Sequence, residues 1–549
     1  MHPFLEKNKR YLKMIKPYLK YEYKILFLLL IGSVIGLSSS LLFQIIIDRV
    51  LLLKQMYLLK YVLIALFLSY FLGMLISFVT GYLSNYLGQI FSIKLRNKLM
   101  LHILNLKIEK VSESKVGDFM SKISDDVATI TNFLAGTVIS FSSDCFNLLS
   151  TGMLMLFFNV KLSIITLIMC LVQVYASKKY AKITRENQRD VRNNASLNLS
   201  FLNNTFSSIK YIKSFQKEKY TQRNYITVLR KLKDLSFKTF FIQYMYGFTM
   251  SAVSYIGSIV ILVIGVFEIQ KGNMSIGMLF VFDNLTDNFC KLSNNIVGLN
   301  VTVQSVIVAF ERINSIFDLE DEVYDKKISL KSFDIQFKDV EFAYKEKNIL
   351  DKINFEILEG KSYALIGSSG SGKSTICSLL LHFYENQSGS ILIGGRNIND
   401  IGILELRNKI TLVLQDDMII NGTIEDNIRF GNESVSIDKV YEVSKIAGIH
   451  EFIESTPNKY NTYIQEDGEN LSGGQKQRIC LARALLRDGK IFIFDESFSG
   501  LDSETETKVF DNIESYLKGK TRIYITHNEA LVDRIETVFE LKDGKVICR

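Results

Sequence analysis

The stretch Gly367-Ser368-Ser369-Gly370-Ser371-Gly372-Lys373-Ser374-Thr375 directly follows a short apolar run, residues 363–366. The apolar run predicts a buried strand, and we expect a helix to begin at Lys373. Glycines let backbone N–H groups approach phosphate oxygens, and the N-terminus of a helix adds positive potential. We therefore predict that this stretch binds a nucleoside triphosphate. Lys373 should reach the β- and γ-phosphates, and the Ser374 hydroxyl should bind Mg²⁺.

A second apolar run, residues 491–494, ends in two acids, Asp495 and Glu496. Beside a phosphate loop, an acid at the end of a neighbouring strand supports the Mg²⁺ shell, and we give this role to Asp495. Glu496 lies one residue further on, where a general base could address an attacking water. The alternative is that both acids only solvate the end of a strand. Strand-like and helical runs alternate from about Phe333 onward, which predicts a soluble α/β domain.

The chain of 549 residues is too long for one compact core, so we expect at least two domains. Hydrophobic residues make up 48% of the sequence and concentrate before Leu299. Runs long enough to cross a bilayer predict an all-α domain of six membrane spans. The third and fourth spans share one long run, which Asn159 and Lys161 break. The runs are residues 25–47, 61–83, 134–176, 240–267 and 276–299.

The distribution of charged residues predicts the orientation of the chain in the membrane and argues against a nucleic acid partner. The first 24 residues are rich in lysine and arginine, which places the N-terminus in the cytosol. An even number of spans returns the α/β domain to the same side. We expect a multi-pass protein of a prokaryotic cell membrane, in contact with the lipid bilayer. The net charge of +8 is scattered along the chain, so we do not expect a nucleic acid partner.

Polar residues mark the sixth predicted span. Asp283, Asp287, Lys291 and Asn294 follow one another at helical spacing and share one face of a helix. Ionisable groups in a span are costly unless they face water or one another. One interpretation is the polar lining of a substrate cavity, and the other is an intrahelical Asp287–Lys291 pair without substrate contact. Asp144 in the third span likewise faces two interpretations, a cavity role or a structural hydrogen bond to a neighbouring helix.

The string Leu471-Ser472-Gly473-Gly474-Gln475 lies between the phosphate loop and Asp495. It resembles the signature of ATP-binding-cassette (ABC) proteins. The whole chain resembles a half-size ABC transporter of the exporter type, with six spans followed by one α/β P-loop cassette. The domains expected from this resemblance are a basic elbow helix (1–24), a transmembrane domain (25–312), a linker (313–332) and the cassette (333–549).

The resemblance implies roles for further residues. Tyr344 corresponds to the aromatic residue that stacks on adenine, although it could be a strand core residue beside Val340 and Phe342. Gln415 corresponds to the glutamine that touches Mg²⁺ and the attacking water, and His527 to the histidine that contacts the γ-phosphate. Asp502 ends a segment similar to the D-loop, residues 499–502. Residues 466–470 resemble the segment that meets the transmembrane arms.

The resemblance also implies a dimer that uses ATP and Mg²⁺. The signature residues Ser472, Gly473, Gly474 and Gln475 would contact the ATP held by the opposite subunit. A homodimer is expected, and a heterodimer with a related half-transporter is open. Long helical segments between the spans carry two predicted coupling regions, residues 107–120 and 203–215, although an ordinary amphipathic helix–turn–helix is the alternative for each.

The implied function is ATP-driven export of an amphipathic small molecule, lipid or peptide by alternating access. The rival is a channel or signalling ATPase that the cassette gates without net pumping. The sequence leaves the substrate open.

Overall fold

The computed structural model describes residues 19–114, 116–322, 330–345, 347–414, 418–465 and 468–549, without the side chains of residues 300 and 301. The chain divides into two compact units, which are described separately. The first comprises Met1–Ile103 and Val116–Asp318, and the second comprises Leu104–Lys115 and Leu319–Arg549. The predicted basic elbow helix lies mostly outside the described residues, which begin at Leu19.

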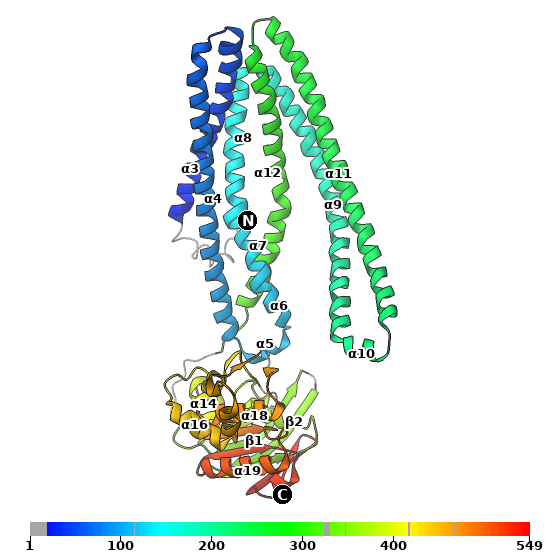
Figure 1. Ribbon diagram of the computed structural model, residues 1–549. Helices are drawn as coiled ribbons and strands as arrows, with labels where there is room; N and C mark the ends of the chain where they lie inside the picture. Colours follow the sequence, from blue (N-terminus) through cyan, green and yellow to red (C-terminus); the bar gives the residue numbers. More distant parts are fainter. Residues whose placement is uncertain (1–18, 115, 323–329, 346, 415–417, 466–467) are drawn as a thin grey trace. The chain divides into compact units, whose positions relative to one another are not determined.

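The first unit is helical (Figure 1). Six helical stretches among the described residues are long and apolar enough to cross a membrane, which confirms the predicted all-α six-helix domain. They are formed by α3 (Leu19–Ile45) with the π-helical turn η2 (Ile46–Leu52), α4 (Leu59–Leu104), α8 (Val138–Phe158), α9 (Val160–Ser207), α11 (Glu218–Gln270) and α12 (Ile276–Phe317).

Asn159 makes the predicted break between the third and fourth spans. Its backbone is extended, and its side-chain oxygen accepts hydrogen bonds from the backbone N–H groups of Lys161 and Leu162. An asparagine that caps a helix in this way satisfies N–H groups which have no partner inside the helix. The residue therefore ends α8 and starts α9 within a single position.

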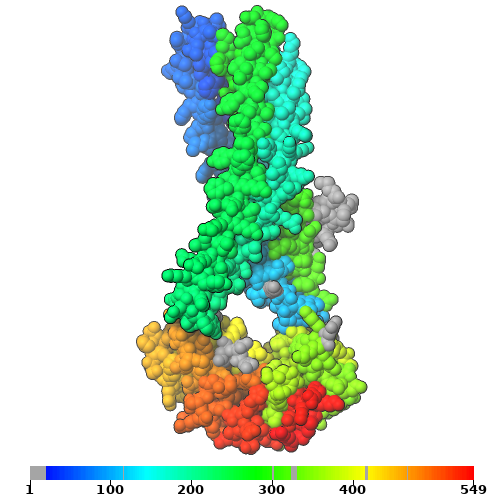
Figure 2. Space-filling view, turned by 90° about the vertical axis from the view of Figure 1, so that its right-hand side faces the viewer, coloured from blue at the N-terminus to red at the C-terminus, as the bar shows by residue number. Residues whose placement is uncertain are grey.

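Helices α9 and α11 lie side by side along most of their length, as Figures 1 and 2 show. The short helix α10 (Ile209–Ser214) joins their far ends. On the other long loop, a run of short helical segments leads into α8: α6 (Val116–Ser121), η4 (Lys122–Asp126), α7 (Val127–Asn132) and η5 (Phe133–Thr137). Arg312 of α12 donates hydrogen bonds to Asp118 and Asp126 of this run, at 3.1 and 3.2 Å.

The second unit contains the predicted α/β cassette. An antiparallel sheet has the order β2-β1-β4-β5, and a larger sheet has the order β12-β11-β3-β10-β9-β6. Within the larger sheet all neighbouring strands except the β11–β12 pair are parallel. The strands are β1 (Ile335–Tyr344), β2 (Lys347–Ile357), β3 (Ser362–Ile366), β4 (Ser388–Ile393), β5 (Arg396–Asn397), β6 (Ile410–Val413), β9 (Ile491–Asp495), β10 (Thr521–Ile525), β11 (Thr537–Lys542) and β12 (Lys545–Cys548), with a separate pair of β7 (Gly422–Thr423) and β8 (Tyr463–Ile464).

The parallel strands are buried on both faces, as their continuous apolar sequences indicate. Side chains of one face of β9, Ile491 and Ile493, belong to one hydrophobic core, and those of the other face, Phe492 and Phe494, belong to a second. The helices of the cassette are α13 (Lys373–Leu380), α14 (Ile403–Lys409), α15 (Ile424–Arg429), α16 (Ile437–Ile446), α17 (His450–Ser455), α18 (Gly473–Leu485), α19 (Ser503–Tyr516) and α20 (Glu529–Val532).

Part of the first predicted coupling region belongs to the cassette unit. Helix α5 (Ile108–Glu113) is tied to it by hydrogen bonding between the hydroxyls of Ser112 and Tyr384 at 3.2 Å. Just before α5, Lys107 pairs with Glu320 at 3.1 Å and with Glu385 at 3.7 Å. Helix α12 runs on to Phe317, beyond residue 312, where we expected the transmembrane domain to end.

Candidate functional site

The phosphate loop lies between β3 and α13. Gly372, at the N-terminus of α13, has φ +110°, a conformation that glycine adopts without strain. A Cβ atom on Gly367 would lie 2.4 Å from the backbone oxygen of Leu541, so the loop needs glycine there as well. The loop therefore brings bare backbone to the N-terminus of a helix, which is the geometry that binds phosphate.

Lys373 is folded over this loop. Its ammonium group donates to the backbone oxygens of Gly367 at 2.6 Å and Ser368 at 3.0 Å, and the residue is only 6% exposed. Burial lowers the pKa of Lys373, and the nearby carboxylates of Glu496 and Asp495 act in the opposite direction. The charge is thus held beside the loop at low solvent exposure, where its attraction for phosphate oxygens is strong.

Ser374 and Asp495 come together from α13 and β9. The Ser374 hydroxyl donates to a carboxylate oxygen of Asp495 at 2.9 Å. Burial raises the pKa of Asp495, although the hydrogen bond from Ser374 works against that shift. A hydroxyl and a carboxylate suit Mg²⁺, which takes few protein ligands and completes its shell with phosphate and water oxygens. Within the described residues the two groups predicted to hold the metal are therefore in mutual contact.

Glu496 and His527 face one another just beyond the carboxyl ends of β9 and β10. A carboxylate oxygen of Glu496 lies 3.3 Å from Nε2 of His527. Glu496 has φ +51°, unusual for a residue with a side chain, and its N–H donates to the backbone oxygen of Ile525 at 2.9 Å. Parallel neighbouring strands bring their carboxyl ends to one edge, so β9 and β10 place both side chains there.

The signature residues form the N-terminus of α18. The Ser472 hydroxyl accepts from the N–H of Gln475, and the Gln475 side chain accepts from the N–H of Ser472, which is a capping box. A Cβ atom on Gly474 would lie 2.8 Å from the backbone oxygen of Gly500, so this glycine permits close contact with the predicted D-loop. Gly473 has open space around its missing side chain.

The groups of the predicted phosphate loop suit a bound nucleotide. Ser371 has a buried hydroxyl without a hydrogen-bond partner among the described residues, at the centre of the loop. Such an orphaned group is costly unless something bonds to it. The loop's backbone, the Lys373 ammonium and the Ser374–Asp495 pair supply the donors and ligands that a magnesium–nucleotide complex requires.

A polar cavity lies in the helical unit between α9, α11 and α12. It has about 1130 Å³ of empty space, including its open side. Asp283 accepts a hydrogen bond from Ser258 of α11 at 2.5 Å, and Asp287 pairs with Lys291 at 2.5 Å. Met250 and Tyr255 contribute larger, less polar side chains. Asp283, Asp287, Lys291 and Asn294 all line the cavity, so the shared helical face is found as the sequence spacing predicts.

Comparison with known proteins places these features in a family. Family models match residues 23–287 as an ABC transporter transmembrane region and residues 350–499 as an ABC transporter. The chain is 30% identical over 530 residues to the lactococcin-G-processing and transport ATP-binding protein of Lactococcus lactis, covering 94% of this chain and 74% of that protein.

The chain belongs to the ABC transporter family. It is also 29% identical over 546 residues to the ATP-dependent lipid A-core flippase of Syntrophus aciditrophicus, covering 98% and 90% of the two chains. The solved structure of a bacterial Atm1-family ABC exporter with ATP bound has the same fold, with a TM-score of 0.81, 22% identity, and 96% and 94% coverage. This ABC transporter is therefore a multi-pass membrane protein whose cassette binds and hydrolyses ATP to drive export.

Two further nucleotide-site predictions fall on described residues of the transporter. Tyr344 is 38% exposed, whereas Val340 and Phe342 on the same strand are buried. Irregular pairing between β1 and β2 around these positions separates Tyr344 from the core face, and its ring meets that of Tyr384 edge-on at 5.1 Å. Asp502 caps α19 by accepting from the N–H of Thr505 at 3.0 Å, and this bond lowers its pKa.

Some other predicted residues do not belong to the nucleotide site or to the polar cavity as the structure describes them. Gln415, and residues 466–467 of the predicted 466–470 segment, lie outside the described residues. Asp144 of α8 is not among the described residues that line the polar cavity, and it lies beside Asn295 of α12. This position favours the structural interpretation of Asp144.

Gln477 is a site residue that the sequence reasoning missed. Its buried side chain donates to the backbone oxygen of Glu496 at 3.3 Å and accepts from the N–H of Gly500 at 2.9 Å. It thereby joins α18 to the segment that carries the predicted general base. The only sequence signal was a polar residue on the inward face of α18, two positions after the signature.

Proposed function

We propose that two copies of this ABC transporter form an exporter that works by alternating access on an amphipathic lipid, peptide or small molecule. The observation that carries the proposal is the polar cavity between α9, α11 and α12, in helices long enough to span a membrane. An ionisable group such as Asp283 is costly inside a span unless it faces water or a polar ligand. A cavity that exposes Asp283 to a polar ligand would offset this cost.

The nature of the cargo is inferred from the cavity and the relatives. Carboxylates, hydroxyls and amides share the cavity with Met169, Met250 and Tyr255, so both polar and apolar parts of a ligand find partners. The two relatives are a lipid A-core flippase and a lactococcin-G transport protein, named for a lipid and a peptide cargo. Both cargo classes are amphipathic.

A dimer is supported by two exposed surfaces. Helix α10 and the residue after it present Ile209, Tyr211 and Phe215 to solvent. The cassette has a groove of about 1180 Å³, including its open side, lined by the exposed residues Leu414, Met418 and Phe430. An apolar helix tip and an apolar groove match as docking partners. We propose that α10 of one subunit docks in this groove of the partner subunit, and that the N-terminus and cassette lie in the cytoplasm.

The hydrolytic chemistry is assigned to the residues at the ends of β9 and β10. Mg²⁺, held by Ser374 and Asp495 with Gln415, would neutralise developing negative charge on the phosphates. Lys373 holds the phosphates at the loop. Glu496 accepts a proton from the attacking water, and His527 at 3.3 Å orients this carboxylate and contacts the terminal phosphate.

Transport requires that ATP bind the closed cassette pair more tightly than the open one, because a ligand shifts an equilibrium only by its differential affinity. Ser472 and Gly474 of one subunit would contact the ATP on the other subunit's loop, so that closure depends on the nucleotide. The alternative remains a channel or signalling ATPase gated by the same closure. An intact Glu496 favours turnover over gating alone.

The test is vectorial flux in proteoliposomes that contain only this chain. We expect a fluorescent-headgroup lipid or a labelled amphipathic peptide to move in an ATP-dependent, one-way manner. Glu496→Gln should abolish movement while ATP binding persists, and Glu504→Gln, an exposed acid nearby, should not. Equal flux in both directions with ATP bound but not hydrolysed would establish the channel. Activity that appears only with a second, related chain would establish a heterodimer.

A further inference from the structure

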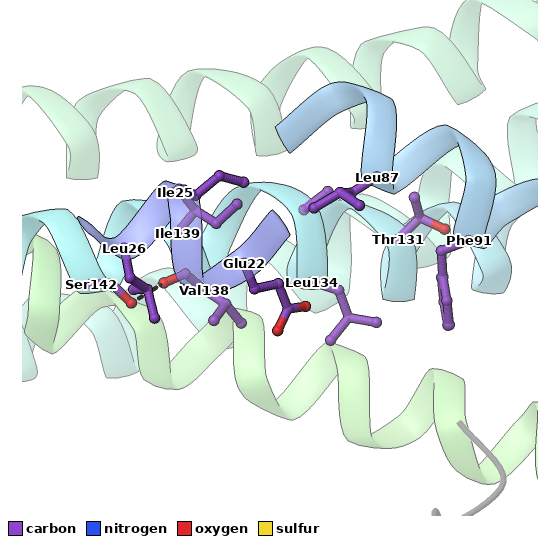
Figure 3. A pocket seen from close by; sticks show the side chains of 12 residues that line it. Glu22, Ile25, Leu26, Leu87, Phe91, Thr131, Leu134, Val138, Ile139 and Ser142 are labelled. Carbon is purple, nitrogen blue, oxygen red and sulfur yellow. Dashed lines mark hydrogen bonds between the residues drawn. The ribbon is translucent and has the colours of Figure 1, made fainter. Parts of the chain in front are cut away.

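A second pocket of the helical unit lies away from the polar cavity and shares none of its lining residues. It is formed by the start of α3, the middle of α4, and the segment α7–η5–α8, with about 720 Å³ of empty space including its mouth. Figure 3 shows side chains from all three elements around it. Most of them are apolar: Ile25, Leu26, Leu87, Phe91, Leu134, Val138 and Ile139.

Beside the pocket, α4 and η5 approach each other closely. A Cβ atom on Gly88 would lie 2.7 Å from the Cβ of Ala135, and the Ser84 hydroxyl donates to the backbone oxygen of Ala135. Ala135 belongs to the π-helical turn η5, and such turns cluster at functional sites. Helix α3 does not fill the space beside this contact.

Two polar side chains lie in the wall of the pocket, one without an ion-pair partner and the other without a hydrogen-bond partner among the described residues. Glu22 is the one ionisable side chain among the described lining residues, and no ion pair links it to another described residue. Thr131 is 8% exposed, and its hydroxyl has no hydrogen-bond partner in the described part of the chain. A buried hydroxyl without a partner is costly, so a group that bonds to it would be favourable.

Glu22 lies among apolar side chains on both sides. In Figure 3 it stands between Leu134, Leu87 and Thr131 on one side and Ile25, Leu26 and Ile139 on the other. Lys20 and Lys24, which flank Glu22 in α3, are exposed and mark the border between charged and apolar sequence. Glu22 thus lies where the charged start of the sequence gives way to the apolar first span, a position expected near the boundary between lipid headgroups and hydrocarbon.

We propose that this pocket binds a single-chain amphiphile with a primary ammonium headgroup, taken from the membrane. The ammonium has three donors and no acceptor, so it suits the Glu22 carboxylate, which has no cation beside it among the described lining residues. The alkyl chain lies along Ile25, Leu26, Val138 and Ile139. An anionic or phosphate headgroup is disfavoured because it would meet the Glu22 carboxylate without a cation among the lining residues described.

The occupant would act on the segment that leads to the cytosolic end of the unit. Residues 131–142 of the pocket wall continue directly from Asp118 and Asp126, which pair with Arg312 of α12. A ligand that holds α3 against η5 therefore contacts the same continuous segment that is bonded to α12. This site is separate from the proposed export cavity, and the failure of either proposal leaves the other intact.

The test is photolabelling of the full-length transporter in phosphatidylcholine nanodiscs. The probes are a diazirine-bearing dodecylamine and the matching dodecanol, and the labelled peptides are mapped by mass spectrometry. We expect amine adducts within residues 22–26, 87–91 and 131–142. Glu22→Gln should lower labelling by the amine about tenfold, as expected for loss of one charge-assisted bond, and change labelling by the alcohol less than about twofold.

Control variants separate the pocket from general effects. Asp125→Asn removes an exposed carboxylate that does not line the pocket, and labelling should stay unchanged. Ile139→Trp should block both probes, whereas Phe141→Trp, an exposed position on the same helix, should not. The proposal is overturned if adducts map elsewhere, if Glu22→Gln leaves amine labelling unchanged, or if neither probe labels the pocket because the N-terminal segment or a second subunit covers it.

Discussion

Arg407 donates two hydrogen bonds to the carboxylate of Glu322, at 2.7 and 2.8 Å. Glu322 has a side chain only 5% exposed, and its backbone N–H donates to the backbone oxygen of Asn105 at 2.7 Å. The Arg407 guanidinium also lies over the ring of Phe383, 5.0 Å from its centroid. One ion pair therefore ties the chain that leaves α12, the chain that precedes α5, and α14 into the same unit.

We predict that Arg407→Met destabilises the cassette unit by about 3 kcal/mol, because it removes the guanidinium that donates two hydrogen bonds to the buried Glu322 carboxylate. The double variant Arg407→Met/Glu322→Leu should recover much of this loss, since two apolar side chains can replace a buried pair at little cost. Calorimetry of the purified transporter would measure both. Substrate stimulation of the ATPase should fall in the single variant, because the coupling segment is no longer fixed to the cassette.

The matched control is Arg534→Met. Arg534 pairs with Asp511 at 2.7 Å, but both side chains are largely exposed, so the change should cost between about 0 and 1 kcal/mol. Equal losses for Arg407→Met and Arg534→Met would contradict the structural role of the Arg407–Glu322 pair.

Asp495 yields a prediction about pH. Burial raises its pKa above the usual value of 3.8, so the folded state favours the protonated form. The stability that Asp495 contributes is fully present at a pH below its pKa in the unfolded state. This stability is lost as the pH rises through its pKa in the folded state. Asp495→Asn mimics the protonated carboxyl. Without nucleotide, we expect its melting temperature at pH 7 to exceed that of the wild type.

The difference in melting temperature should shrink as the pH falls toward the pKa of the carboxyl, and a scanning series between pH 7.5 and about 4 would show this trend. Asp543→Asn, at an exposed hairpin turn, should show no such pH-dependent difference. A wild type more stable than Asp495→Asn at neutral pH would mean that the interaction of Asp495 with Ser374 and Lys373 outweighs the cost of burying its charge.

In the helical unit, Asp48 of the turn η2, which follows α3, joins the first span to the start of α12. It accepts hydrogen bonds from the Ser275 hydroxyl at 2.5 Å and from the N–H of Gly277 at 2.8 Å. Any conformation that separates the end of α3 from the start of α12 must break these bonds. Losing these hydrogen bonds costs about 1 kcal/mol, so Asp48→Ala should favour separation roughly fivefold.

A cysteine in place of the buried Met274, in a background without the native cysteines, would report this opening. Its labelling by a membrane-impermeant maleimide should be faster in Asp48→Ala and unchanged in Lys60→Ala, an exposed residue of α4. If both variants label at the wild-type rate, Asp48 does not hold the two helices together.

The sequence predicted local features well where one short stretch carries the information. The order of strand, glycine loop and helix around Lys373 follows from residues that are neighbours in the chain. Asn159 could be recognised as the turn between two spans because it is a polar residue that interrupts a long apolar run. The confirmed six-helix and α/β fold follows from the same kind of local pattern.

Contacts between distant residues were harder to predict. The resemblance pointed to residues 107–120 as a coupling region, but the sequence did not reveal the contacts that join α5 to the cassette unit, in which Lys107 meets Glu320 and Glu385. Gln477 looks like any polar helical residue until the fold brings Glu496 and Gly500 to it. The pocket beside Glu22 is lined in part by the π-helical turn η5, and such a turn has no clear sequence signature.

The polar cavity provides the last prediction. Asp283 is held by Ser258, whereas Asp287 already pairs with Lys291 four residues later in the same helix. If the cavity binds a cationic or amphipathic cargo, Asp283→Asn should reduce cargo stimulation of the ATPase more than Asp287→Asn does. A hydrogen bond to a charged group is worth about 1.5–3 kcal/mol, so we expect the half-maximal cargo concentration to rise at least tenfold.

The basal ATPase separates this loss of binding from damage to the fold, because the cassette residues are untouched by the change. Ser258→Ala offers a second comparison, since it removes the partner of Asp283 but keeps the charge. Its effect should be smaller than that of Asp283→Asn when the carboxylate itself contacts the cargo. Equal effects of Ser258→Ala and Asp283→Asn would show that the Ser258–Asp283 bond serves to pack α11 against α12.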